Sequence, residues 1–154
     1  MTHEPNESVA REKLHAYLVD ILRSLPTHLS LSLFNPNHPN ARFDTGLTMP
    51  FNDTDPEGME LYYFDISYWL VGCRPERSET CFRVVVEAWK RLEWHPESSR
   101  NRRPLAAVAR TPDGYGFALQ QSVDGHLSLS ASTPPFPPGG TGCGPFPESI
   151  TTDT

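Results

Sequence analysis

The sequence predicts an α+β fold in which an antiparallel sheet of about four to six strands carries two helices on one face. Apolar residues recur at helical spacing in 9–25 and 78–92. Segments 29–34 and 61–71 alternate with a period of two, as strands do. Residues 105–132 form three short segments joined by two Asp-Gly pairs, which are typical of hairpin turns.

The first helix is predicted from seven apolar side chains that recur at helical spacing. They are Val9, Leu14, Tyr17, Leu18, Ile21, Leu22 and Leu25. Asn6 or Ser8 is expected to cap its beginning, and Pro26 ends it because proline cannot continue a helix. His15, near the apolar edge, is expected to pack there rather than to act as a ligand or base.

Two strands are expected to follow, separated by a long loop. The first places Leu29, Leu31 and Leu33 on one face. The loop 35–58 is longer than most structureless connections, which is typical of functional or mobile loops. Within it, the short extended pieces 41–44 and 47–51 could add an edge pairing.

Segment 61–71 is the most aromatic part of the chain and has two different faces. One face carries Tyr62, Phe64, Ile66, Tyr68 and Leu70, and the other carries Leu61, Tyr63, Asp65, Ser67, Trp69 and Val71. We expect a strand with a core face and a partly exposed aromatic face. Tyr63 and Trp69 either pack beneath a loop or helix or anchor a protein interface, where these residue types are enriched.

The second helix is expected to begin at an N-cap formed by Ser78 and to end before Pro96. Its apolar stripe consists of Phe82, Val85, Val86, Trp89 and Leu92. The following segment 98–103 contains three arginines, and we expect a solvated loop there rather than a phosphate site.

The three strands after residue 105 have a predictable register. Two-residue loops would pair Leu119 with Ser130, an apolar residue with a polar one on the buried face. Three-residue loops, closed by a left-handed glycine, instead gather the apolar residues on one face. We therefore predict the pairs Ala107 with Leu119, Ala109 with Phe117, Leu119 with Leu129, and Phe117 with Ala131.

Length and composition predict a single α+β domain over 7–136, a disordered N-terminus over 1–6 and a flexible Pro/Gly-rich tail over 137–154. The 154 residues include 13 Lys and Arg against 19 Asp and Glu, a net charge of −6. Such a chain is a poor match for nucleic acid or anionic membranes, because both attract cationic surfaces. No secretory signal or spanning segment is visible, so we expect a cytoplasmic protein.

The search for catalytic and metal-binding chemistry gives negative expectations. Asp53, Asp55 and Gly58 imitate the start of a calcium loop, but its twelfth position is Phe64 instead of glutamate. Cys73 and Cys81 lack the spacing and partners of a zinc site or an activated nucleophile. A disulfide between them is conceivable but is not expected in the cytoplasm. We expect no catalytic residue, no metal and no cofactor.

The segments 89–94, 111–117 and 124–134 resemble a family of small actinobacterial proteins of unknown function. Its members are lipoprotein-like, and some are regarded as immunity-like or envelope-associated. The resemblance covers residues 7–136 and implies no catalytic residues. Members carry Pro-Cys-Asp-Asp and Ser-Pro-Cys motifs, whose matching positions here, 50–53 and 133–135, contain no cysteine. Should those cysteines pair in relatives, their joint loss fits a cytoplasmic variant.

These observations predict a non-enzymatic protein-binding module, such as an immunity or accessory protein that covers a partner protein. A basic partner is expected because the chain is acidic. The candidate partner-binding residues are Tyr63, Asp65, Trp69, Asp53 and Asp55.

Two alternatives stay open. One is a small hydrolase or transferase that uses the loop 35–58, with Asp53, Asp55, His38 or Cys81 as reacting groups. The other is a structural subunit of a homodimer. The sequence leaves the oligomeric state and the partner's identity undetermined.

Overall fold

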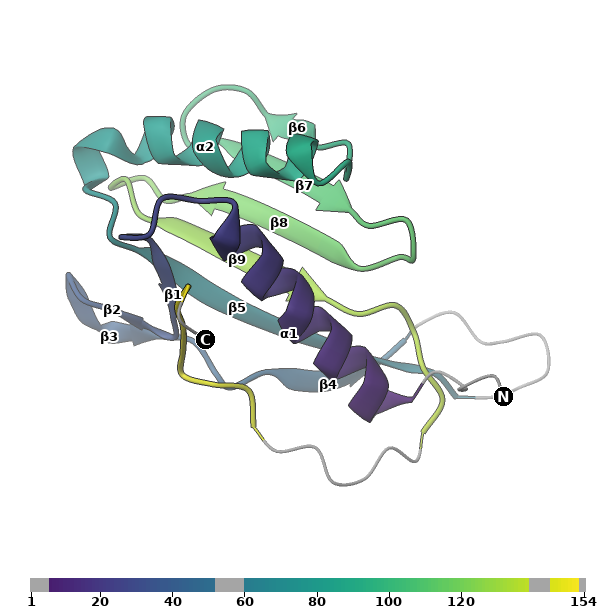
Figure 1. Cartoon of the computed structure of the whole chain (residues 1–154). Helices are drawn as coiled ribbons and strands as arrows, with labels where there is room; N and C mark the ends of the chain where they lie inside the picture. Colours follow the sequence, from purple (N-terminus) through teal and green to yellow (C-terminus); the bar gives the residue numbers. More distant parts are fainter. Residues whose placement is uncertain (1–5, 52–59, 139–144, 153–154) are drawn as a thin grey trace.

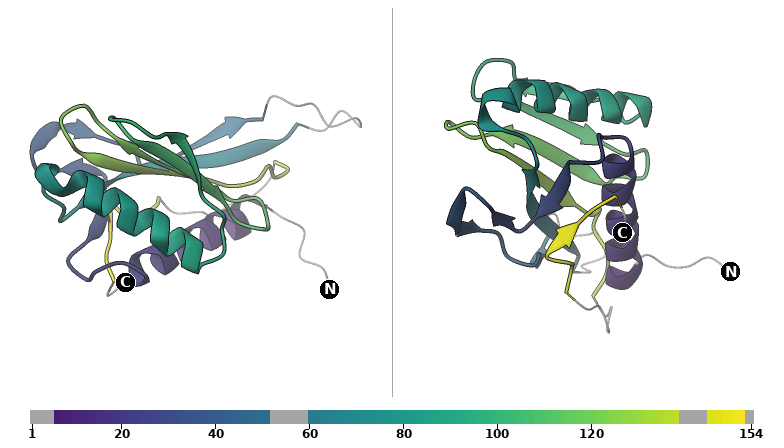
Figure 2. Two further views of the ribbon diagram at one scale, coloured as in Figure 1. Left: turned by 90° about the horizontal axis from the view of Figure 1, so that it is seen from above. Right: turned by 60° about the vertical axis from the view of Figure 1, so that its left-hand side comes forward.

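Both helices of the chain lie on one face of a single large antiparallel sheet (Figures 1 and 2). The computed structural model describes residues 6–51, 60–138 and 145–152. The helices are α1 (Glu7–Arg23) and α2 (Ser78–Arg91), the latter preceded by the 3-10 turn η1 (Pro75–Arg77). The strands are β1 (Ser30–Ser32), β2 (Phe34–Asn35), β3 (His38–Arg42), β4 (Leu47–Pro50), β5 (Tyr62–Val71), β6 (Glu97–Arg100), β7 (Ala106–Arg110), β8 (Gly116–Gln121), β9 (Leu127–Ser132) and β10 (Ser149–Ile150).

The predicted α+β class is confirmed, with a larger sheet than expected. The eight-stranded sheet has the order β10-β1-β5-β9-β8-β7-β6, and β4 pairs with the first half of β5. The strands β2 and β3 form a separate two-stranded sheet. The edge pairing considered for 47–51 is present as β4. The unexpected strands are β6, which is exposed throughout and so carries no apolar pattern, and β10, whose two residues are too few to show one.

The predicted register of the last three strands is confirmed. Ala107 pairs with Leu119, which also pairs with Leu129, and Phe117 pairs with both Ala109 and Ala131. Each loop has three residues between its closing pair and ends in a glycine with positive φ, 93° at Gly114 and 90° at Gly125.

The hydrophobic core lies between the helices and one face of this sheet. Strand β5 contributes Phe64, Ile66, Tyr68 and Leu70, α1 contributes Leu14, Leu18, Ile21 and Leu22, and α2 contributes Phe82, Val85, Ala88 and Trp89. Trp94, just after α2, stacks on Phe117 of β8 with ring centroids 5.0 Å apart. Such packing explains why the helical stripes and the strand alternation could be recognised in the sequence.

Three local expectations are wrong. Ser78 is the first residue of α2 rather than its cap, and its buried hydroxyl accepts a hydrogen bond from the Gln121 side chain (2.7 Å). Part of the Arg-rich segment is strand β6 instead of loop. The tail is packed where the structure describes its end: β10 pairs with β1, and Phe146 lies 4.9 Å from the Phe64 ring in the core.

The expectation that Cys73 and Cys81 stay unpaired is also wrong, because a disulfide joins them. Cys73 follows β5 and Cys81 lies in the first turn of α2, so the bond closes the connection between strand and helix. None of the described helices has the length and apolarity that a membrane span requires.

A polar cluster ties α1 to the turn between β7 and β8. The Asp113 carboxylate lies 2.5 Å from Lys13 Nζ and accepts hydrogen bonds from the hydroxyls of Tyr17 (2.8 Å) and Thr111 (2.5 Å). Burial alone would raise the pKa of Asp113, but the hydrogen bonds from Lys13, Thr111 and Tyr17 outweigh it and lower the pKa. The cluster fixes the end of the meander against the first helix.

We expect Asp113→Asn to lower the free energy of unfolding at pH 7 by about 1 kcal/mol, because the exposed side of the cluster is screened by solvent. Since the folded pKa is lowered, this stabilisation is present above pH 3.8 and is lost as the pH falls through the folded value. Denaturation of both proteins at pH 7 and at pH 2.5 measures the difference. Asp124→Asn, at the same position of the second turn, is the control, and an equal loss there would contradict the role of the helix contact.

We expect Cys73→Ala/Cys81→Ala to lower the free energy of unfolding by about 2–3 kcal/mol, since the disulfide closes a short loop whose residues are 8 apart in sequence. Denaturation of the wild type with and without a reducing agent should reproduce the same difference. The reductant should leave the double variant unchanged. Two free thiols at these positions in the purified protein would contradict the structure.

Candidate functional site

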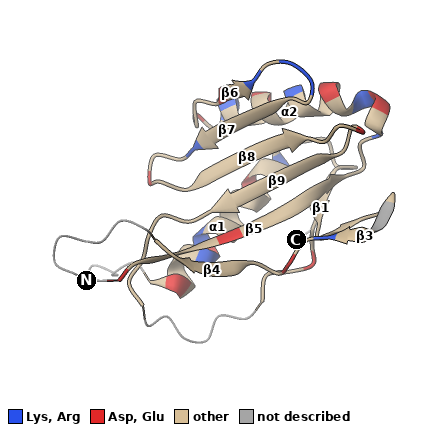
Figure 3. Cartoon of the chain, turned by 180° about the vertical axis from the view of Figure 1, so that it is seen from behind, with Lys and Arg blue, Asp and Glu red and all other residues tan. Residues whose placement is uncertain are grey.

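The candidate site is the face of the sheet opposite the helices, which we call the open face (Figure 3). Its residues alternate with those of the core along each strand. They are Tyr63, Asp65, Ser67 and Trp69 of β5, Ser128, Ser130 and Ser132 of β9, Gly116, Ala118 and Gln120 of β8, and Ala106, Val108 and Arg110 of β7. The middle strands β8 and β9 contain no charged residue (Figure 3), and Asp65 is the charged residue of β5.

The register of the strands arranges this face in three rows that run from β5 across β9 and β8 to β7. The first row is Asp65, Ser132, Gly116 and Arg110, the second is Ser67, Ser130, Ala118 and Val108, and the third is Trp69, Ser128, Gln120 and Ala106. In every row the residue of β9 is a serine, and the residues of β8 include a glycine and an alanine. In the first row, the two middle side chains are therefore smaller than those at the two ends.

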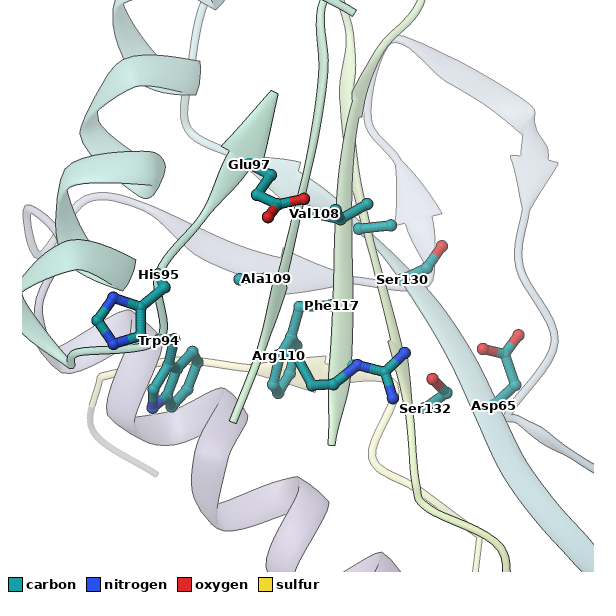
Figure 4. Close-up of a pocket in the computed structure, with 12 residues that line it drawn as sticks. Asp65, Trp94, His95, Glu97, Val108, Ala109, Arg110, Phe117, Ser130 and Ser132 are labelled. Carbon is teal, nitrogen blue, oxygen red and sulfur yellow. The ribbon is translucent and has the colours of Figure 1, made fainter. Parts of the chain in front are cut away.

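A concavity of about 640 Å³ occupies part of the open face (Figure 4). Its lining includes Gly116, Ala118, Ser130 and Ser132 from the middle strands. Asp65 stands on the β5 side and Arg110 on the β7 side, at opposite ends of the first row. The concavity thus has a floor of small side chains, with Asp65 on one side and both Arg110 and Glu97 toward the other.

Asp65 is half-buried, and among the described residues none forms a hydrogen bond or ion pair with its carboxylate. Burial raises the pKa of Asp65, since a desolvated carboxylate is less stable in its charged form. Leu47 of β4 and Ser132 of β9 are its cross-strand neighbours. Asp65 is therefore a partly desolvated carboxylate on the open face that no described residue stabilises by an ion pair or hydrogen bond.

The two predicted aromatic anchors lie on the same face as Asp65 and are held from below or beside by neighbouring segments. The Trp69 indole stacks on Phe43 with centroids 4.8 Å apart and donates from Nε1 to the Ala41 carbonyl oxygen (3.1 Å). Tyr63 lies across from Met49 of β4, and both aromatic side chains remain half-buried. Trp69 therefore packs against the segment 41–43 and also keeps part of its side chain exposed on the open face.

The structure brings together Tyr63, Asp65 and Trp69, while Asp53 and Asp55 lie outside the described residues. The side chain of His38 is also outside the description. Sequence reasoning missed Arg110 as a site residue. The predicted three-residue loop already placed Arg110 beside Gly116, so its position opposite Asp65 needed only the pairing of β5 with β9.

The open face carries mainly small and aromatic side chains. Within the described ranges, no three His, Cys, Asp or Glu side chains are placed to hold a metal ion. The hydroxyls of Ser67 and Ser130 share a hydrogen bond of 2.8 Å, and His95 lines the same concavity as Ser130 and Ser132. Small side chains between two charges can accept a protruding surface, which is how interfaces achieve close contact.

We expect Asp65→Asn to stabilise the protein at pH 7, because the raised folded pKa means that folding disfavours the charged carboxylate. The side chain is half-exposed, so the gain should stay below ~1 kcal/mol, about 2–4 °C in Tm at most. Below pH 3.8, the ordinary aspartate value, the difference should vanish. Asp20→Asn on the exposed side of α1 is the control, and a destabilised Asp65→Asn protein would contradict the absence of a partner.

No known protein family matches the chain, and neither a curated protein sequence nor a solved structure shows significant similarity to it. The resemblance to small actinobacterial proteins accordingly stays a prediction. The geometry of the open face carries the functional argument.

Proposed function

We propose that the protein is a non-enzymatic protein-binding module and that the open face is its binding surface. One observation carries the proposal: both helices cover the same face of the sheet, while the other face holds a desolvated, unpaired carboxylate among small and aromatic side chains. A partner that supplies a cation to Asp65 would relieve the cost of that carboxylate.

An ordinary solvated sheet face is the alternative explanation, because antiparallel sheets often expose one face to water. Such faces are usually rich in long charged side chains. Here ten of the twelve residues in the three rows are serine, alanine, glycine, glutamine, valine or tryptophan, and only the ends of the first row are charged. Half-buried Trp69 and Tyr63 add the residue types that dominate binding energy at interfaces.

An immunity or accessory role, with a basic partner, is the form of this proposal that the net charge of −6 favours. The sequence predicts that this role is carried out in the cytoplasm. The Cys73–Cys81 disulfide favours an oxidising compartment instead, because such bonds are rare in the cytoplasm. Alkylation of thiols in freshly lysed cells distinguishes the two locations, since a reduced pair would fit the cytoplasm.

The binding proposal is tested by affinity capture of the tagged protein from its native lysate at 0.1 M and 0.5 M salt. We expect a protein retained in stoichiometric amount, identified by mass, and weakened by salt. Ser130→Arg places a long charged side chain on the floor of the open face and should reduce capture at least tenfold. Thr80→Arg, on the exposed surface of α2, is the matched control and should retain the partner. Equal capture by both variants, or none by the wild type, would overturn the proposal.

A further inference from the structure

We infer that the open face binds a second copy of this chain, forming a two-fold symmetric dimer in which the two sheets pack face to face. The inference rests on the proposed function, because it names a partner for the same surface; that partner is a second acidic copy in place of the basic protein that the net charge favours. Its basis is the charge pattern of the first row, where Asp65 and Arg110 stand at opposite ends with Ser132 and Gly116 between them.

This pattern is self-complementary. Adjacent strands lie about 4.8 Å apart, so Asp65 and Arg110 are separated by three strand spacings, about 14 Å between their backbones. A two-fold axis that runs along the strands, midway between β9 and β8, reverses the row. It places Asp65 of each copy opposite Arg110 of the other, so that one operation forms two identical ion pairs.

Among the described residues, neither Asp65 nor Arg110 has a hydrogen bond or ion pair of its own. Intramolecular pairing between them is prevented by the two intervening strands. The second copy would supply the cation that the desolvated Asp65 lacks and the anion that the exposed Arg110 lacks. A uniformly basic partner would satisfy only Asp65, and a neutral partner would form an ion pair with neither group.

The sizes of the side chains are complementary under the same axis. Strand β5 then faces β7 of the second copy, and β9 faces β8. The large stacked pair of Trp69 and Phe43 faces Ala106, one of the small side chains of the face. In the middle, serines of β9 meet Gly116 and Ala118. These small residues allow the separation of about 10 Å at which two sheets pack.

The sheet extends further on one side of the axis, where β1 and β10 continue it beyond the second half of β5. The facing area uses β9, β5 and β4 on that side, and β8, β7 and β6 on the other. They span about 24 Å across and about 17 Å along the strands, roughly 400 Å² in projection on each copy. Interfaces of this size are at the weak end of specific association, so the dimer should dissociate on dilution. Both helices would lie on the outside, away from the contact (Figure 2).

The test is sedimentation velocity from 1 to 500 µM with the full chain. The wild type should show a monomer–dimer equilibrium that weakens between 50 and 500 mM salt. Asp65→Arg and Arg110→Asp should each raise the dimer Kd at least tenfold, because each reversal turns two attractive pairs into repulsive ones. The double variant Asp65→Arg/Arg110→Asp exchanges the charges and should restore the wild-type Kd within about threefold. Asp20→Arg on α1 is the control and should leave the Kd unchanged.

A wild type that stays monomeric at 500 µM would overturn the dimer, as would a double variant no tighter than the single ones. Circular dichroism and Tm show that each variant is folded. If the chain is monomeric but Ser130→Arg still loses a captured protein, the dimer fails while the open face remains a binding surface for another protein. If both experiments are negative, the proposed function fails too.

Discussion

The two-residue period of strand β5 is the constraint on which the structure depends. One set of alternate residues, Phe64 to Leu70, enters the core beneath the helices, and the other set faces away from them. A shift of one residue would exchange the two sets and place Asp65 and Ser67 in the core. Because β5 pairs with β9 on one side and with β1 and β4 on the other, its register fixes both the core and the open face.

At Asp65, partial burial disfavours the charged carboxylate that the surface of strand β5 carries. A neutral residue at this position would suit the partly desolvated surroundings better, as the raised pKa of Asp65 indicates. Sites that bind partners often retain such unfavourable groups, since the favourable contact is made only in the complex. The small residues of the neighbouring strands have the same character, because they contribute little to the core and leave space above the sheet.

The sequence was informative wherever burial repeats with a regular period. The stripes of both helices, the alternation of β5 and the loops ending in Gly114 and Gly125 could be predicted because each follows from local geometry. The edge strand β6 could not, since all its residues are exposed and no apolar pattern marks it. The position of Arg110 opposite Asp65 depends on the pairing of β5 with β9. These two strands lie far apart in the sequence, so no local pattern predicts that they pair.

The C-terminal segment has a protective effect on the edge of the sheet. Strand β10 hydrogen-bonds to β1, the Leu33 amide donates to the Glu148 carbonyl oxygen (2.8 Å), and the Tyr68 hydroxyl donates to Pro147 (2.8 Å). Without this segment, the apolar strand that contains Leu31 would present unpaired backbone groups at an open edge. Such edges recruit strands from other molecules and promote aggregation. Residues 147–150 therefore protect the β1 edge from pairing with other molecules. Their removal during expression or proteolysis would expose that edge and promote aggregation.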